Sequence, residues 1–256
     1  MLVAPLLSAW LAPASAQVRD INDAINKAGR QRMLSQRMAK AYVALGQGVR
    51  REQAERVLAD SMSLFDRQLV ELRAYAPQPD IKQQYEQLET VWSGYKTALV
   101  GAIPSNPGSE IVLKLAAQVL EQADRGTQML EAASGRPTGK LVNVAGRQRM
   151  LSQRMATMYL ATSWGVQAEA SLKMLATSRD EFGRAQEVLR SAPEATPAIR
   201  DALALADQQF GFFDALLAGL KAGQANPRAQ ADAFTTSERI LQMLDEVTAM
   251  FARGGA

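Results

Sequence analysis

The residues best suited to chemistry are arginines that occur in two identical segments. Residues 28–39 and 145–156 both read AGRQRMLSQRMA, so all twelve positions match at an offset of 117. A guanidinium group stays protonated at physiological pH and presents a planar fork of N–H donors, which suits carboxylates, phosphates and other planar oxyanions. The first chemistry to consider is therefore the binding of an anion.

Composition removes most other kinds of site. The 256 residues include no histidine and no cysteine. This excludes disulfides, thiol nucleophiles, the usual zinc ligand sets and Ser-His-Asp triads. A haem would lack its axial histidine, and a ferritin-like di-iron site would lack its Glu-x-x-His ligands. We therefore expect no enzyme activity, no metal and no cofactor. The net charge of +3 is modest, so we also expect no nucleic-acid partner.

Positive charge is concentrated around the two segments. Seven Lys and Arg residues and no acid occur at positions 26–51, and five with no acid occur at positions 132–168. The rest of the chain therefore sums to −9. A solvated helix face would explain any single arginine, because most arginines lie at surfaces. It would not explain twelve consecutive identities, although a recent local duplication would.

Glycine and proline divide each half of the chain into four intervals. The breaks fall at residues 46–48, 77–79 and 104–109 in the first half, and near residues 164–165, 193–197 and 226–227 in the second. Thr196-Pro197 and Asn226-Pro227 are typical helix starts. The intervals, of roughly 25 residues or about 38 Å as helices, are rich in helix-forming residues. Short connections favour antiparallel neighbours, so we predict an all-α fold of two tandem up-down four-helix bundles.

The N-terminal residues predict export. An apolar run from Leu2 to Leu11 precedes Ala14-Ser15-Ala16, a small-x-small cleavage site, although a basic n-region is missing. We predict a signal peptide at 1–16, a first bundle at 17–134 and a second at 135–256. Two prolines argue against a core helix at 1–16. No later stretch reaches the roughly 18–20 apolar residues of a membrane span, so we expect a soluble periplasmic protein without a transmembrane segment.

Topology predicts where the two segments meet. Four helices return the chain to its starting end, so the first helices of the two halves run parallel and can face each other as a pseudo-twofold pair. Arg32 points toward the side of Gly29, where a neighbour can approach closely. If Arg32 and Arg149 converge there without counter-charges, they repel, and a bound anion would reverse that repulsion. The sequence leaves open whether the bundles pack side by side or end to end.

Residues 25–37, INKAGRQRMLSQR, strongly resemble the P-box of nitrate/nitrite sensor kinases of the NarX type. They equally resemble the N-terminal domain of PilJ-type chemoreceptors linked to type IV pili. In the nitrate-sensing members one anion lies between paired first helices, held by the motif arginines. The resemblance therefore implies a ligand site with these residues: Arg32, Arg149, Gly29, Gly146, Arg37, Arg154, Lys27, Met33 and Met150. The second copy has Val144 in place of the motif lysine, and the methionines suit core packing better than metal binding.

Two functions remain open. The first is a periplasmic sensor module that binds a small oxyanion, with nitrate or nitrite favoured through the resemblance, and that signals through a membrane sensor or another envelope protein. The second is an envelope adaptor whose basic helices bind an acidic protein. The sensor predicts that Arg32 and Arg149 are buried together, and the adaptor predicts that they are exposed. A wide separation of Arg32 and Arg149, with each in water or bound to its own carboxylate, would count against the ligand.

Overall fold

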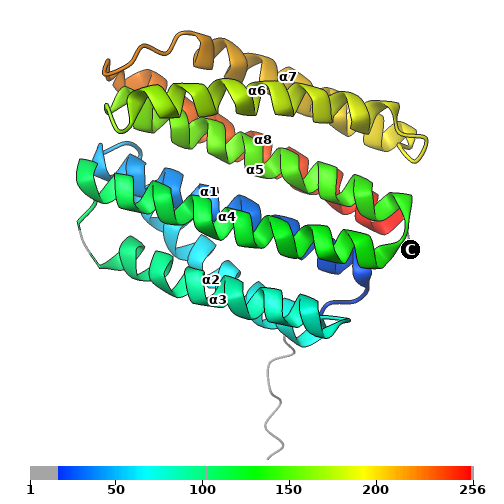
Figure 1. Cartoon of the computed structure of the whole chain (residues 1–256). Coiled ribbons are helices and arrows are strands. Elements are labelled where there is room, and N and C mark those ends of the chain that lie inside the picture. Colours follow the sequence, from blue (N-terminus) through cyan, green and yellow to red (C-terminus); the bar gives the residue numbers. More distant parts are fainter. Residues whose placement is uncertain (1–16, 102, 255–256) are drawn as a thin grey trace, which may run out of the picture.

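The computed structural model describes residues 17–101 and 103–254, and within them the regular structure is eight helices and no strand (Figure 1). In chain order the helices are α1 (Ile21–Gly46), α2 (Arg51–Tyr75), α3 (Pro79–Val100), α4 (Asn106–Ser134), α5 (Pro137–Ser163), α6 (Ala168–Ser191), α7 (Pro197–Ala218) and α8 (Pro227–Gly254). The predicted all-α fold class is confirmed.

Local capping explains where several helices begin and end. The side chain of Thr196 accepts a hydrogen bond from a backbone N–H in the first turn of α7, and Asn226 does the same for α8. Pro197 and Pro227 then supply a fixed φ at the first helical position, as the sequence predicted. Gly135 ends α4 with a φ of 59°, which glycine adopts without the strain that a Cβ would cause.

Helices α1 to α4 form one bundle, and helices α5 to α8 form the second. In each bundle the first helix packs against the second and the fourth, and the third packs against the fourth. Figure 1 shows the resulting order, with α2 and α3 on one outer side, α1 and α4 next, then α5 and α8, and finally α6 and α7. One continuous hydrophobic core runs through both bundles. The prediction of two tandem up-down bundles is confirmed.

The bundles pack side by side, chiefly through α1 and α5. These two helices run parallel, because Arg32 contacts the carbonyl of Asn143 in their first halves and Gln47 contacts the carbonyl of Leu160 near their ends. A methyl group added at Gly29 would lie 3.6 Å from the Cα of Gly146. The paired glycines thus allow the backbones to approach closely, and the two first helices form the pseudo-twofold centre of the molecule.

Helix α1 is enclosed on nearly every side, since 21 of its 26 residues are buried. It packs against α2 and α4 of its own bundle and against α5 and α8 of the other. Its polar side chains therefore need partners inside the protein, because burying an unpaired polar group is costly. The motif residues lie in the interior and not on a solvated face.

The predicted signal peptide lies outside the described residues. The boundaries 17–134 and 135–256 stay a prediction; in the structure α4 ends at Ser134 and α5 begins at Pro137. Among the helices described between residues 17 and 254, none combines the length and the apolar character that a membrane crossing requires.

Candidate functional site

Arg32 of α1 and Arg149 of α5 meet where the two parallel helices cross. Their side chains are 1% and 0% exposed. A methyl group at Gly29 would lie 3.3 Å from Nη2 of Arg32 and 3.5 Å from Nη2 of Arg149, and Gly146 has the same two neighbours at 3.5 and 3.2 Å. The two guanidinium groups therefore lie over the paired glycines, and the convergence expected from topology is present.

Each guanidinium reaches across to the other bundle. Nη2 of Arg32 donates to the backbone carbonyl of Asn143 on α5 at 3.1 Å, and Nη2 of Arg149 donates to that of Asn26 on α1 at 3.0 Å. The glycines leave room for these side chains to lie between the helices. The arginines thus tie the two bundles together as well as forming the candidate site.

A carboxylate from the fourth helix of each bundle pairs with each arginine. Nη1 of Arg32 lies 2.5 Å from Asp124 of α4, and Nη1 of Arg149 pairs with Asp245 of α8. The protein's own carboxylates therefore supply the counter-charges, and relief of the repulsion between the two arginines does not depend on a bound anion. Asp124 and Asp245 follow their arginines by 92 and 96 residues, so only the packing of the fourth helices brings them into the site.

Two cations share each carboxylate around the motif. Asp124 pairs with Arg147 as well as Arg32, and Asp245 pairs with Arg30 as well as Arg149. The four arginines thus outnumber the two aspartates, and the centre retains positive charge. The same sharing recurs at the margins: Glu238 is shared by Arg37 and Lys40, and Glu181 is shared by Arg147 and Arg154.

Burial makes these charges costly to hold. Desolvation lowers the pKa of Arg149 to about 10, against the opposing charge of Asp245. Desolvation also lowers the pKa of Arg32, against Asp124. Burial by itself would raise the pKa of Asp245, but Arg149 and Arg30 outweigh it and the pKa falls below its usual value. Arg149 therefore remains protonated at neutral pH, and further negative charge would stabilise the protonated form of both arginines.

The central arginines also keep unused hydrogen-bonding capacity. Among the described residues, Nε of Arg32 and Nε of Arg149 are buried donors without a partner. The side-chain oxygens of Asn26 and Asn143 are buried acceptors without a partner. Buried polar groups are normally satisfied, so these four atoms are exceptions within the motif.

The other predicted residues lie around this centre and not in it. Arg37 binds Glu238 and Ser61, whereas Arg154 binds Ser178 and Glu181. Lys27 pairs with Asp23 and Glu71. Val144, which replaces this lysine in the second copy, packs against the core. Met33 and Met150 are buried in the core.

Internal hydrogen bonds account for several identities in the two segments. Gln31 donates to the carbonyl of Phe65, and its counterpart Gln148 donates to that of Phe182. Ser35 donates to the carbonyl of Arg32, and Ser152 donates in the same way within α5. Fixed partners of this kind preserve residue type without a ligand. The arginine pair also has fixed partners in two aspartates and two backbone carbonyls, and among the described residues only the Nε donor of each arginine is left without one.

A groove of about 480 Å³ opens beside the pair, between α1, α2 and α8. Arg30, Arg37 and Asp245 line it together with apolar residues such as Met33 and Leu241. The side chain of Asp245 is 40% exposed and touches Arg149, so it stands between the groove and the buried arginine. Within residues 17–101 and 103–254 no group of three or more His, Cys, Asp or Glu could hold a metal ion.

Comparison with known families agrees with the duplication. A family model described as the N-terminal region of type IV pili methyl-accepting chemotaxis transducers, PilJ, matches the chain twice, over residues 14–134 and 130–249. No curated protein and no solved structure matches the chain. The PilJ side of the resemblance is confirmed, whereas the likeness to nitrate sensors stays a prediction.

Proposed function

The chain belongs to the PilJ family of chemotaxis-transducer N-terminal domains, and on that premise we propose that it is a periplasmic sensory module that binds a small planar oxyanion between α1 and α5. Nitrate and nitrite are the favoured ligands, because of the resemblance of its motif to that of nitrate sensors. Arg32 and Arg149 are the principal ligands in this proposal. It includes no catalytic step.

The charge balance of the buried centre carries the proposal. Four arginines share two aspartates, and both central guanidinium groups keep an unpaired Nε–H. A planar oxyanion offers coplanar lone pairs to two adjacent N–H donors of one guanidinium, which a spherical ion such as chloride does not. Desolvated charge-assisted bonds of this kind are stronger than those in water.

The aspartates define how a ligand would enter. Asp124 is 23% exposed and Asp245 is 40% exposed, whereas their arginines are buried. An incoming anion therefore competes with the more exposed Asp245, which can turn into the adjoining groove. Displacing Asp245 loosens the link between α8 and α5, and this gives ligand binding a mechanical consequence that a signalling partner could detect.

The rival adaptor function requires the motif arginines on an exposed face. Arg32 and Arg149 are instead fully buried, and Arg30, Arg37 and Arg154 are engaged with acids of neighbouring helices. The most exposed motif arginine, Arg147, is itself paired with Asp124 and Glu181. In the described part of the chain the motif arginines therefore form no continuous exposed face, and we retain the sensor as the proposed function.

Calorimetric titration of residues 17–256 with nitrate and nitrite, with chloride as the control, tests the proposal. We expect binding at about millimolar affinity or tighter and its loss in Arg32→Ala. The matched variant Asp245→Asn removes the competing charge and should strengthen binding by roughly 10-fold, about the effect of one charge-assisted hydrogen bond. Absence of binding in both the unaltered chain and Asp245→Asn, with each folded by circular dichroism, would overturn the proposal.

A further inference from the structure

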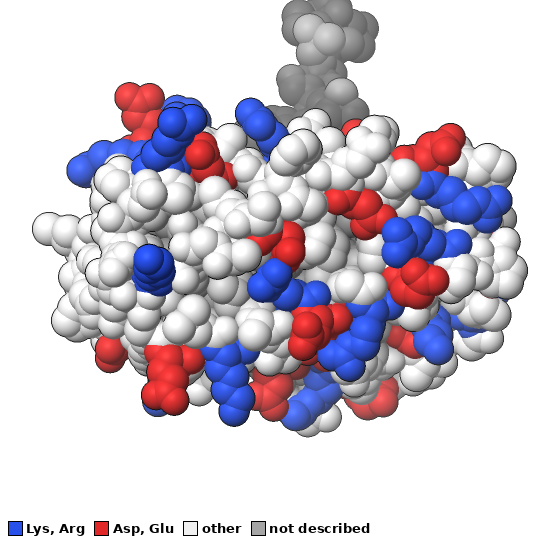
Figure 2. Space-filling model, turned by 90° about the horizontal axis from the view of Figure 1, so that it is seen from above, with Lys and Arg blue, Asp and Glu red and all other residues white. Residues whose placement is uncertain are grey.

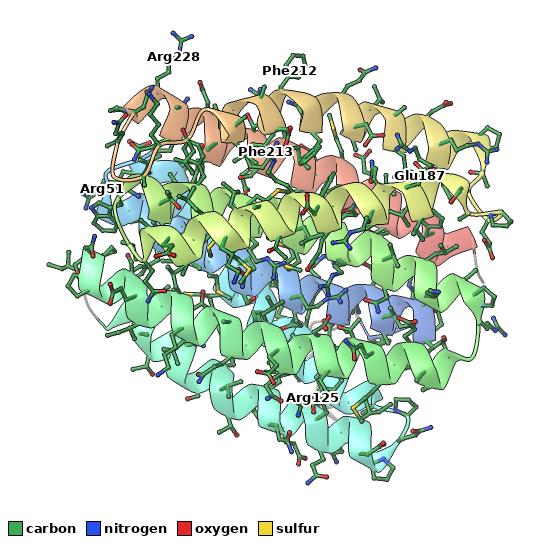
Figure 3. The ribbon with its side chains drawn as sticks, turned by 45° about the horizontal axis from the view of Figure 1, so that its top comes forward. Arg51, Arg125, Glu187, Phe212, Phe213 and Arg228 are labelled. Carbon is green, nitrogen blue, oxygen red and sulfur yellow. The ribbon has the colours of Figure 1, made fainter. Side chains whose placement is uncertain are left out.

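The outward face of α7 exposes large apolar side chains. Leu205 is 57% exposed and Phe212 is 74% exposed. Phe212 projects away from the molecule, whereas its neighbour Phe213 points beneath the helix into the bundle (Figure 3). Figure 2 looks onto the α6–α7 side, where the middle of the left part is mostly uncharged and charged side chains gather along its upper and lower margins. A soluble helix normally presents polar residues on its outer side.

The duplicated bundle provides an internal control, because α3 occupies the place that α7 occupies in the second bundle. The register is fixed by aromatic packing: Trp92 of α3 stacks on Phe65, and Phe210 of α7 stacks on Phe182 in the same way. Three residues further along each helix, Tyr95 and Phe213 meet these rings edge-on. Residues of α3 and α7 therefore correspond at an offset of 118.

At this offset the exposed faces differ in character. The outward positions of α3 are mostly polar: Glu86, Gln87, Thr90, Ser93, Gly94 and Thr97. The corresponding exposed positions of α7 are Ala204, Leu205, Gln208, Gly211, Phe212 and Ala215. The inner residues of both helices are apolar alike. The first bundle thus has a polar face at this place, so four-helix packing by itself does not require the apolar face of α7.

We propose that the α7 face is the contact between two copies of this chain, packed antiparallel about a twofold axis at Gln208. A twofold contact sets one face against itself, so positions at equal distances on either side of the axis meet. Phe212 of one copy then lies over Ala204 of the other. Leu205 of one copy likewise lies over Gly211 of the other. Each large side chain is matched with a small one, as close helix packing requires.

Charge supports a second copy as the occupant. A face that meets itself must avoid a strong charge of one sign, and residues 202–220 contain no basic residue and only two acids, Asp207 and Asp214, which are paired with Arg190 and Arg179. The antiparallel arrangement brings Glu194, before α7, toward Lys221, beyond its end. Neither side chain forms an ion pair within the described part of the chain, so both are available.

The oligomeric state of residues 17–256 is the direct test, measured by analytical ultracentrifugation. We expect a reversible dimer at micromolar concentration. The double variant Leu205→Glu/Phe212→Glu should weaken dimerisation roughly 100-fold or more, because it would bury carboxylates without partners in an apolar contact. The matched variant Gln87→Glu/Gly94→Glu alters the corresponding α3 positions and should leave it unchanged. A chain that stays monomeric at hundreds of micromolar, or a dimer equally weakened by both variants, overturns the proposal.

Cysteine cross-linking tests the axis itself, since the chain has no cysteine of its own. Gln208→Cys places one thiol beside its copy on the twofold axis and should give a disulfide-linked dimer under mild oxidation. Thr90→Cys, at the corresponding exposed position of α3, should remain monomeric on a denaturing gel. Equal cross-linking of both variants, or none in Gln208→Cys, contradicts the assignment. The test requires no anion, so its outcome is independent of the proposed oxyanion site.

Discussion

Lys40 of α1 and Glu238 of α8 form an ion pair between the two bundles, with 2.6 Å between Nζ and Oε1. Lys40 is completely buried, and its ammonium group also donates to Gln153 and Ser237. The corresponding residue of α5 is Thr157, whose hydroxyl donates to backbone carbonyls. The pseudo-twofold symmetry is therefore broken at this point, because the Lys40–Glu238 ion pair has no counterpart at Thr157, although Arg147 of α5 still pairs with Asp124 of α4.

Removing Glu238 should destabilise the protein more than removing Lys40. Glu238→Ala leaves a buried ammonium group without a carboxylate, and we expect a loss of about 3–5 kcal/mol in the free energy of unfolding. Lys40→Thr installs the residue of the second bundle and leaves Glu238 paired with Arg37, so its cost should be smaller. Urea unfolding measures both, and the double variant should recover part of the loss. Equal losses in the two single variants would show that the pair is not coupled in this way.

Acid should destabilise the protein through Glu238. Burial alone would raise the pKa of Glu238, but Lys40 and Arg37 outweigh it and lower the pKa from 4.5 to about 2. The unfolded state therefore binds more protons in this window, so stability from this group is complete above pH 4.5 and is lost as pH falls toward 2.

Protonation of Glu238 should lower the free energy of unfolding by at most roughly 3 kcal/mol, which is the free energy that corresponds to this pKa shift. Urea unfolding at several pH values between 7 and 2.5 should show it, together with a smaller contribution from Asp245, whose pKa is also lowered. Glu238→Gln should flatten the dependence. A Gln variant with the same slope as the unaltered chain would assign the acid sensitivity to other carboxylates.

A methyl group at the paired glycines should be tolerated poorly. In Gly146→Ala the new carbon would lie 3.2 Å from Nη2 of Arg149, so the guanidinium must shift from its bond to the carbonyl of Asn26. We expect a net loss of about 1–2 kcal/mol, since overpacking outweighs the gain in helix propensity. Gly183 in α6 faces open space, and Gly183→Ala should be neutral or stabilising. Thermal unfolding compares the two, and equal effects would exclude close packing as the cause.

The two central arginines should contribute equally to anion binding. Arg32→Lys and Arg149→Lys each keep a positive charge but lose the planar fork, so we expect each to weaken nitrate binding by about 10-fold. Because the pseudo-twofold axis relates their environments, the losses of nitrate affinity in the two variants should agree within about threefold. Calorimetric titration of both variants provides the comparison. A large effect of one and none of the other would place the ligand in only one half of the centre.

Much of the fold could be read from local pattern. The helix starts at Thr196 and Asn226 follow from side chains that cap the adjacent backbone, and glycine and proline end helices through their own φ preferences. The meeting of Arg32 with Arg149 followed from the repeated segment and an even number of helices. These inferences depend on interactions within a few residues or on simple topology, so the sequence was sufficient for them.

The neutralisation of that pair was decided by tertiary structure. Asp124 and Asp245 are separated by 121 residues, whereas Arg32 and Arg149 are separated by 117. Aligning the two halves at the offset of 117 therefore does not place the two aspartates opposite each other. In the sequence, Lys40 likewise does not differ from the other basic residues of its segment. Its partner Glu238 is identified only by the packing of α8 against α1. The partner of a buried charge depends on the rotation and register of helices packed from distant parts of the chain. Helical periodicity shows the direction in which a side chain leaves its own helix, and only packing determines what it meets.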